Sequence, residues 1–349
     1  MLMRNAQKFS VQGAYRLFSL ILSLSGLLLL TACIRATPPP DPTATPSPMP
    51  TNTLQATIIV VEGTEMAVVQ PANPSATPNF EIPNPVRINE LQFIQNGHQV
   101  QMMAKLHNIL NDALLRDISF EFLLLDVDGN RLARTTGAVK YIFARETTGV
   151  VMSVDLTPGM VAANLQMQIT GGKEERGLNY TQPFTITQSR SAAKPNGQSA
   201  YAWLENRDKL TYTQVSLNAI AYNKQGEIIC GGAKPQEFVP SADKIGVSVP
   251  LTNCPSAPAV VDLYAFLTPF SGALDDGSWQ ENIEVRNWDF IVSEKNQLAG
   301  GIELRNKTDR TLTKNYFILT AYSETDQVCL AENSFLDALW PSEEGVYSP

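Results

Sequence analysis

The sequence predicts an all-β protein in which three tandem β-sandwich modules follow a long N-terminal tether. A recurring segment is the first observation: "QMMAKLHN", "SAYAWLEN" and "AGGIELRN" end at Asn108, Asn206 and Asn306, which lie 98 and 100 residues apart. The second is an apolar strand, a polar turn and another apolar strand further along each copy: "FEFLLLDVDGNRL", "LNAIAYNKQGEII" and "FILTAYSETDQVC". Short strands at regular spacing, with turn signals between them, are typical of repeated β-sandwiches.

Turn chemistry supports a hairpin in each copy. Asp128-Gly129 and Gln225-Gly226 are residues that tight turns prefer, because glycine adopts positive φ without strain. In the third copy Thr325-Asp326 stands at this place, in a loop that the alignment makes one residue shorter. The stretch "ENSFLDALW" (332–340) is compatible with one short helix.

The third module is expected to be incomplete. The repeats place the modules at residues 86–182, 183–287 and 288–349. Glycines align late in each copy, at Gly149, Gly246 and Gly345. After Gly246 the second copy continues into a further strand, whereas only four residues follow Gly345. We therefore expect module 3 to lack one strand that its siblings possess. The unpaired strand edge would then reflect either a truncated chain or a site where another chain adds a strand.

One hairpin carries a motif that resembles a known family. Residues Phe122 to Asp126, "FLLLD", resemble the FxLYD motif of small immunoglobulin-like (Ig-like) modules found in bacterial envelope lipoproteins. Leu125 stands where the motif has tyrosine, and Tyr222 and Tyr322 restore it in the later copies, which lack the leading phenylalanine. The resemblance implies Ig-like modules with an extracytoplasmic accessory role and no catalytic residues to carry over.

Residues 1–32 have the layout of a secretory signal, with basic residues followed by an apolar run that ends at Ala32. The run is shorter than the about 20 apolar residues that a stable membrane span needs. It ends in "LTAC", with Cys33 last, which resembles the bacterial lipobox. This resemblance implies a lipoprotein signal peptide, cleavage before Cys33, and acyl chains on Cys33 that hold the protein on a membrane. An uncleaved anchor and ordinary signal cleavage, with Cys33 as an incidental thiol, are the alternatives.

Residues 33–85 are expected to form a disordered tether rich in Pro and Thr, because proline removes a backbone donor and fixes φ. Only residues 56–70, "ATIIVVEGTEMAVVQ", depart from this composition, and an isolated hairpin there would be marginal in water. Whether the tether is glycosylated cannot be read from composition.

Charge and motifs narrow the function classes. Residues 1–32 hold three basic residues and no acidic one, so their removal changes the formal net charge from −8 to −11. An acidic exterior argues against nucleic acid as a partner. His98 and His107 are the only histidines, and no metal-ligand pattern or nucleophile motif accompanies them. We therefore expect no metal site, no cofactor and no enzyme activity.

The remaining cysteines predict one disulfide. Cys230 and Cys254 lie in one module, and outside the cytoplasm we expect them to be bonded, the alternative being two buried thiols. Cys329 aligns with Cys230, and the counterpart of Cys254 would fall beyond Pro349, so Cys329 is expected to form no disulfide within its module.

One polar loop offers a candidate ligand contact. Trp279 lies beside Asp275 and Asp276 in "LDDGSWQEN", and a tryptophan flanked by carboxylates can bind a sugar or a cationic group. Packing of Trp279 against its own sheet is the simpler alternative. Trp203, Trp288 and Trp340 are expected to lie in the core.

These observations favour a lipid-anchored bacterial surface protein on the extracytoplasmic face of a membrane, with a non-catalytic ectodomain that binds an envelope protein or a glycan, or acts as a spacer. The alternative is an accessory lipoprotein subunit of a cell-envelope transport or secretion complex. The sequence identifies neither the ligand nor the partner.

Overall fold

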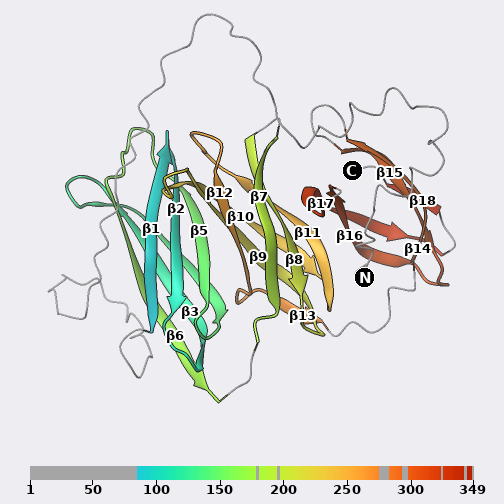
Figure 1. The fold of residues 1–349 in the computed structure, drawn as a ribbon, viewed down its shortest axis with the longest axis horizontal. Helices are drawn as coiled ribbons and strands as arrows, with labels where there is room; N and C mark the ends of the chain where they lie inside the picture. Colours follow the sequence, from blue (N-terminus) through green and yellow to red (C-terminus); the bar gives the residue numbers. More distant parts are fainter. Residues whose placement is uncertain are drawn as a thin grey trace, which may run out of the picture.

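The computed structural model describes residues 85–177, 181–194, 197–274, 283–292, 298–323, 325–341 and 344–347. All regular secondary structure within these ranges is β-strand. The strands form three sandwiches that lie side by side in chain order (Figure 1). The predicted all-β architecture is therefore confirmed. In this part of the chain no helix is long and apolar enough to cross a membrane.

Module 1 is a sandwich of two three-stranded antiparallel sheets, β1-β2-β5 and β4-β3-β6. Its strands are β1 (Val86–Asn96), β2 (Gln99–Asn108), β3 (Ala113–Leu125), β4 (Arg131–Ile142), β5 (Thr147–Asp155) and β6 (Asn164–Arg176). Alternate apolar side chains of both sheets meet in the core, where Met102, Leu106 and Phe122 are fully buried.

Module 2 repeats this plan, with sheets β11-β8-β7 and β10-β9-β12. Its strands are β7 (Phe184–Lys194), β8 (Gly197–Asn206), β9 (Thr211–Tyr222), β10 (Ile228–Val239), β11 (Asp243–Leu251), β12 (Val260–Phe266) and the short β13 (Gly272–Leu274), which also pairs with β9. In both modules the third strand, β3 or β9, is the centre of one sheet.

Module 3 contains the sheet β14-β15-β18 and the pair β16-β17. Its strands are β14 (Ile283–Val292), β15 (Leu298–Asn306), β16 (Leu312–Tyr322), β17 (Val328–Leu339) and β18 (Glu344–Tyr347). Within the described ranges β16 pairs with β17 alone, and no strand takes the place that β6 and β12 fill beside β3 and β9. The expectation that module 3 is incomplete stays a prediction.

Two details of the expected organisation are wrong. The boundary drawn between residues 287 and 288 falls inside β14, which begins at Ile283. Residues 332–339 belong to β17 and form no helix, because pairing with β16 along the whole strand overrides the weak helical pattern.

A third error comes from the hairpin turn of module 3, which is as long as that of module 2. Ser323 N donates to the carbonyl oxygen of Gln327 as Asn223 N donates to that of Glu227. All later positions of copy three therefore shift by one residue relative to the alignment. Strand register confirms the shift: the position of Cys230, Val239 and Gly246 in module 2 is taken in module 3 by Leu330, Leu339 and Val346.

The same backbone conformation recurs in the hairpin turns of all three modules. The fourth residue of the turn has a left-handed backbone in every copy, with φ of +81° at Gly129, +81° at Gly226 and +61° at Asp326. Glycine takes this conformation at no steric cost, and aspartate is among the few other residues that tolerate it.

The recurring asparagine is the structural signature of the repeat. Asn108 is buried at the end of β2, and its Nδ2 donates to the carbonyl oxygens of Ala113, Ile142 and Phe143 at 2.9, 3.1 and 3.0 Å. Its Oδ1 accepts the Leu110 backbone N–H at 3.0 Å. The side chain thus ties the β2–β3 turn to the end of β4.

Both later copies repeat this set of asparagine hydrogen bonds, which we call the asparagine bracket. Asn206 Nδ2 donates to backbone carbonyl oxygens of the following turn and of the end of β10, and Asn306 Nδ2 does the same in the turn and at the end of β17. Their Oδ1 atoms accept the backbone N–H two residues later in the chain. A buried polar side chain with every group satisfied specifies one local structure.

Replacing Asn108 with alanine should destabilise module 1 by about 2–4 kcal/mol, because carbonyl groups that are buried would lose their donor. The exposed Asn111→Ala is a matched control and should change the free energy of unfolding by less than about 0.5 kcal/mol. Chemical denaturation of both variants measures the difference. Equal stabilities would show that the bracket is dispensable.

Candidate functional site

Cys230 and Cys254 form the predicted disulfide, with Cα atoms 4.9 Å apart. Cys230 lies on β10 and Cys254 in the connection between β11 and β12. Among the described residues Cys329 carries a thiol, and its Sγ lies 3.6 Å from the carbonyl oxygen of Gln327. The expectation for Cys329 rested on its alignment with Cys230, and that alignment is the one corrected above.

Other residues that the sequence singled out fall outside the described ranges. These are Cys33 of the lipobox and the loop residues Trp279, Asp275 and Asp276. Trp203, expected in the core, is buried against module 3 rather than inside its own sandwich. Trp340, also expected in the core, is 61% exposed. The reason is the one-residue shift: Leu339, which is 1% exposed, fills the core position that the alignment gave to Trp340.

The described residues show no group of three or more His, Cys, Asp or Glu side chains that could hold a metal ion. The contacts that stand out instead lie where neighbouring modules meet. We call the contact between modules 1 and 2 joint 1, and the contact between modules 2 and 3 joint 2.

Joint 1 is formed by two sheets packed face to face, β1-β2-β5 of module 1 and β10-β9-β12 of module 2 (Figure 1). Ile94, Met103 and Val151 of module 1 belong to the same buried cluster as the interior of module 2. Met103 is completely buried although it points away from the core of its own module. The two modules therefore share an apolar interior across the joint.

A glycine permits this close approach. A Cβ on Gly149 of β5 would lie 2.4 Å from the ring of Tyr264 and 3.1 Å from the side chain of Ile220, both in module 2. Only a residue without a side chain fits between the sheets at this point.

Polar side chains buried in joint 1 bond across it. Gln101 Nε2 donates to the carbonyl oxygen of Gly231 at 2.9 Å, and Gly231 N donates back to Gln101 Oε1 at 2.7 Å. Val151 N donates to Asn218 Oδ1 at 2.8 Å. Gln101 and Asn218 are each 2% exposed, so their hydrogen bonds offset the cost of removing both amides from water.

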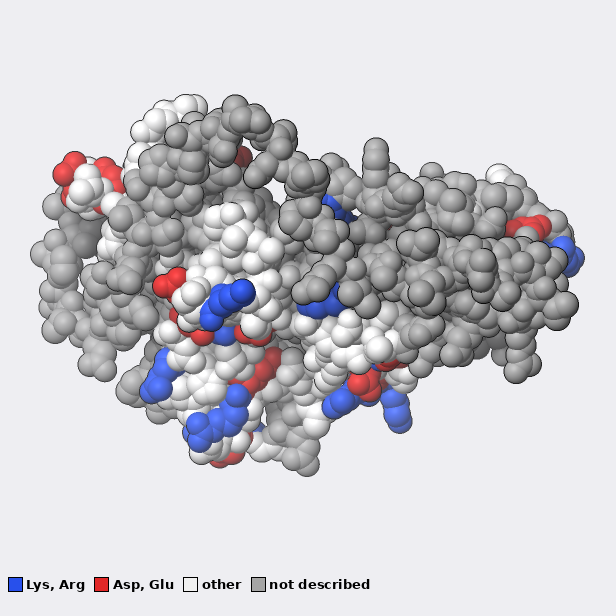
Figure 2. All heavy atoms as spheres, turned by 45° about the horizontal axis from the view of Figure 1, so that its top comes forward, with Lys and Arg blue, Asp and Glu red and all other residues white. Residues whose placement is uncertain are grey.

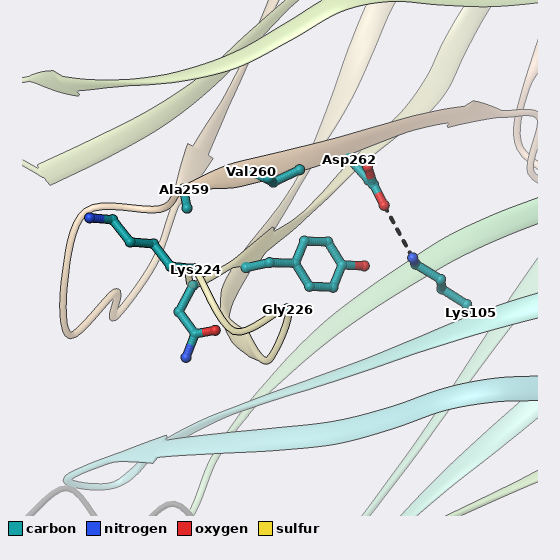
Figure 3. Close-up of a pocket in the computed structure, with 8 residues that line it drawn as sticks. Lys105, Lys224, Gly226, Ala259, Val260 and Asp262 are labelled. Atoms are coloured by element: carbon teal, nitrogen blue, oxygen red, sulfur yellow. Dashed lines mark hydrogen bonds and ion pairs between the residues drawn. The ribbon is translucent and has the colours of Figure 1, made fainter.

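A charged group closes the rim of joint 1. Lys105 Nζ lies 3.1 Å from Asp262 Oδ2 (Figure 3). It also lies 3.2 Å from Glu90 Oε1 and 4.9 Å from the centre of the Tyr222 ring. Tyr222 and Tyr264 hydroxyls donate to Glu90 and Asp262 at 3.2 and 3.3 Å. This lysine of module 1 is thus held by carboxylates and a ring from both modules.

A hollow of about 510 Å³ opens beside this group. It is lined by Lys105, Tyr222, Asn223, Lys224, Gly226, Ala259, Val260 and Asp262. Burial, followed by the neighbouring Tyr264 and Glu90, raises the pKa of Tyr222, so its hydroxyl stays protonated and donates. Lys105 is already paired with two carboxylates, and the hollow offers no nucleophile beside a base. Lys105 and its two carboxylates form an ion-pair network that links the two modules at this hollow.

Joint 2 repeats the geometry of joint 1 with other side chains. A Cβ on Gly246, the counterpart of Gly149, would lie 2.2 Å from the side chain of Thr320 in module 3. Trp203 and Tyr322 pack with ring centres 5.5 Å apart, where joint 1 has Lys105 on Tyr222. Trp203 Nε1 donates to the carbonyl oxygen of Asp326 at 2.6 Å.

Salt bridges flank joint 2 as well. Lys244 Nζ lies 3.0 Å from Asp326 Oδ2 and 4.3 Å from the centre of the Trp203 ring, and Lys194 Nζ lies 3.1 Å from Glu332 Oε1. Figure 2 shows that basic and acidic groups lie close together over the described part of the face it presents.

The sequence reasoning missed both joints. Two signals could have found them: the aligned Gly149 and Gly246 each sit on a strand that meets the next module, and Tyr222 and Tyr322 receive Lys105 and Trp203 at the same repeat position. A glycine within a strand often marks close approach of another backbone or side chain.

The sequence matches no protein-family model and no curated protein. Solved structures that it resembles include a red sea bream transglutaminase, at 10% sequence identity and a TM-score of 0.19, with 53% of this chain and 29% of that chain covered. A glycosyl hydrolase family 2 member from Bacteroides cellulosilyticus DSM 14838 is 11% identical, with a TM-score of 0.16 and coverage of 70% and 29%. The chain spans less than a third of these proteins, and scores this low carry no argument about function.

Replacing Gly149 with alanine should weaken joint 1 by about 1–3 kcal/mol, since the added Cβ overlaps the ring of Tyr264. Gly171→Ala is the matched control, because its Cβ would make only ordinary contact with Ser119 at 3.8 Å. Limited proteolysis of the connection between modules 1 and 2, with thermal unfolding, measures the effect. Identical cleavage rates for the two variants would contradict the close packing.

Glu146 lies at the base of joint 1, beside Gln182 and Pro183 of the connection between the modules. Its Oε2 accepts the Phe143 backbone N–H at 2.7 Å. Burial raises the pKa of Glu146 to about 7. The folded protein therefore binds a proton that the unfolded chain, with an ordinary glutamate, releases at lower pH.

This shift predicts that stability falls as pH rises from about 4.5 through about 7, by on the order of 3 kcal/mol in total. Glu146→Gln, which stays neutral, should remove this fall, and the surface substitution Glu205→Gln should retain it. Denaturation midpoints measured between pH 4.5 and 8 provide the comparison. A Glu146→Gln profile that falls like that of the parent protein would refute the assignment.

Proposed function

We propose that this chain is a lipid-anchored protein of a bacterial cell surface, whose three Ig-like sandwiches form a non-catalytic spacer that presents a binding surface at the end of a Pro/Thr-rich tether. The anchor rests on the likeness of "LTAC" to a lipobox. The spacer role rests on one observation: neighbouring modules share buried, hydrogen-bonded joints.

Buried joints distinguish a stiff array from beads on a string. Contacts between domains of one chain are ordinarily polar and permit relative motion. Here Met103 at joint 1 and Trp203 at joint 2 are almost fully buried. At each joint the packing around the glycine leaves no room for even one added Cβ atom. An array held in this way projects its far end at a fixed distance from its near end, which suits a spacer.

Substituting Cys33 with alanine tests the anchor. The variant should leave the detergent phase on phase partitioning and accumulate as the uncleaved precursor, because the thiol that accepts the lipid is missing. Cys329→Ala is the control and should partition like the parent protein. Normal membrane retention of Cys33→Ala would instead indicate that residues 17–32 act as a span.

The second candidate function is that of an accessory lipoprotein in a transport or secretion complex of the envelope. The resemblance of "FLLLD" (122–126) to the FxLYD motif of modules in envelope lipoproteins supports it, because that resemblance implies an accessory role. Crosslinking in intact cells, followed by purification, separates the two. Recovery of one defined envelope complex would support the accessory role. Recovery of a glycan, or of molecules from a foreign surface, would support the spacer with a binding surface.

A further inference from the structure

Each half-cystine of the disulfide in module 2 is adjacent in sequence to a residue that makes polar contacts in joint 1. Cys230 is followed by Gly231, and Cys254 is preceded by Asn253. The backbone joins the same two segments, since Thr252 N donates to the carbonyl oxygen of Gly231 at 2.9 Å. The half-cystines therefore fix residues 231 and 253 relative to each other.

Both of these residues hold module 1. Gly231 exchanges two hydrogen bonds with the side chain of Gln101, at 2.7 and 2.9 Å. Asn253 Nδ2 donates to Gln99 Oε1 at 2.9 Å, and Asn96 Nδ2 donates to Asn253 Oδ1 at 3.1 Å. Module 2 thus holds the β1–β2 hairpin of module 1 at two points, each adjacent in sequence to one half-cystine.

The second of these points depends on the disulfide more than the first. Gly231 is part of β10 and is kept in place by pairing with Ile220 of β9. Asn253 lies between β11 and β12, has a left-handed backbone with φ of +59°, and belongs to a connection without further strand pairing up to Val260. Cys254 is the covalent tie of that connection to β10.

We propose that the Cys230–Cys254 disulfide is a redox-sensitive clamp on joint 1: it holds Gly231 and Asn253 in the positions that bind module 1, and its reduction loosens module 1 from module 2 while leaving both sandwiches folded. The inference concerns the joint alone and does not require Cys33 to be acylated.

The reductive step has a defined direction. Cys230 is fully buried, whereas Cys254 is partly exposed, so a thiolate reaches the sulfur of Cys254. Attack forms a mixed disulfide with Cys254 and releases the sulfur of Cys230 as a thiolate, which takes up a proton. A second thiol of the reductant then releases Cys254 as a thiol. The protein disulfide gains two electrons and two protons, and the reductant, which is a dithiol, is oxidised to a disulfide.

Hydrogen exchange of the full-length protein, with and without dithiothreitol, tests the clamp. The amide of Val151 is a reporter for joint 1 because it donates across the joint to Asn218. Reduction should raise its exchange rate by at least about tenfold, while exchange in β8 (Gly197–Asn206) and β3 (Ala113–Leu125), inside the two sandwiches, stays the same. Full protection of Val151 after complete reduction would overturn the proposal.

Two variants separate a clamp on the joint from a staple of module 2. Gln99→Ala removes the acceptor of Asn253 Nδ2 while the disulfide is intact, and should itself raise Val151 exchange. Reduction of Gln99→Ala should then add less than it adds in the parent protein, because the two changes act on the contact of Asn253 with module 1. The double variant Cys230→Ala/Cys254→Ser should behave like the reduced protein. If reduction instead accelerates exchange in β8 as much as at Val151, the disulfide stabilises the module as a whole and the proposal is wrong.

Discussion

The close approach of neighbouring sheets at the joints is the constraint on which the rest of the array depends. A sheet in an isolated sandwich shows one face to its core and the other to water, so its strands alternate apolar and polar residues. Module 2 has neighbours on both sides, and β8 and the second half of β9 are buried on both faces. Glycine is needed where a side chain of one sheet lies on the backbone of the other, as Tyr264 lies on Gly149 and Thr320 on Gly246, and both glycines occupy the same repeat position.

The asparagine brackets and the joints act on different levels of the same structure. Asn108, Asn206 and Asn306 fix the turns inside each sandwich, so the strands that carry the joint residues keep one register. The joints then use positions on those strands that face away from the core. Because the same positions serve at both joints, with Lys105 on Tyr222 in one and Trp203 on Tyr322 in the other, the modules stack in a repeated manner rather than as independent domains.

Local patterns made the all-β class, the three copies and the disulfide predictable, because hairpin turns and strand periods are written within short stretches of sequence. The joints were not predictable in this way, since Gln101 and Gly231 are separated by 130 residues and nothing near either residue names the other. A clue did exist: "AYAWL" and "AIAY" lack the polar alternation of a half-exposed strand. The single misjudged turn length in module 3 displaced Cys329, Trp340 and Gly345 together, because alternation sends neighbouring residues to opposite faces.

The most direct test of a stiff array is the distance between its ends. Nitroxide labels on unnatural amino acids at the exposed positions of Asp112 in module 1 and Asp309 in module 3 leave every cysteine untouched. Pulsed electron paramagnetic resonance should give one narrow distance distribution, unchanged between low and high salt, because salt screens only the ion pairs at the rims while the buried apolar contacts and hydrogen bonds hold the joints. A broad distribution would contradict the account, since it would mean that the modules move independently despite their contacts.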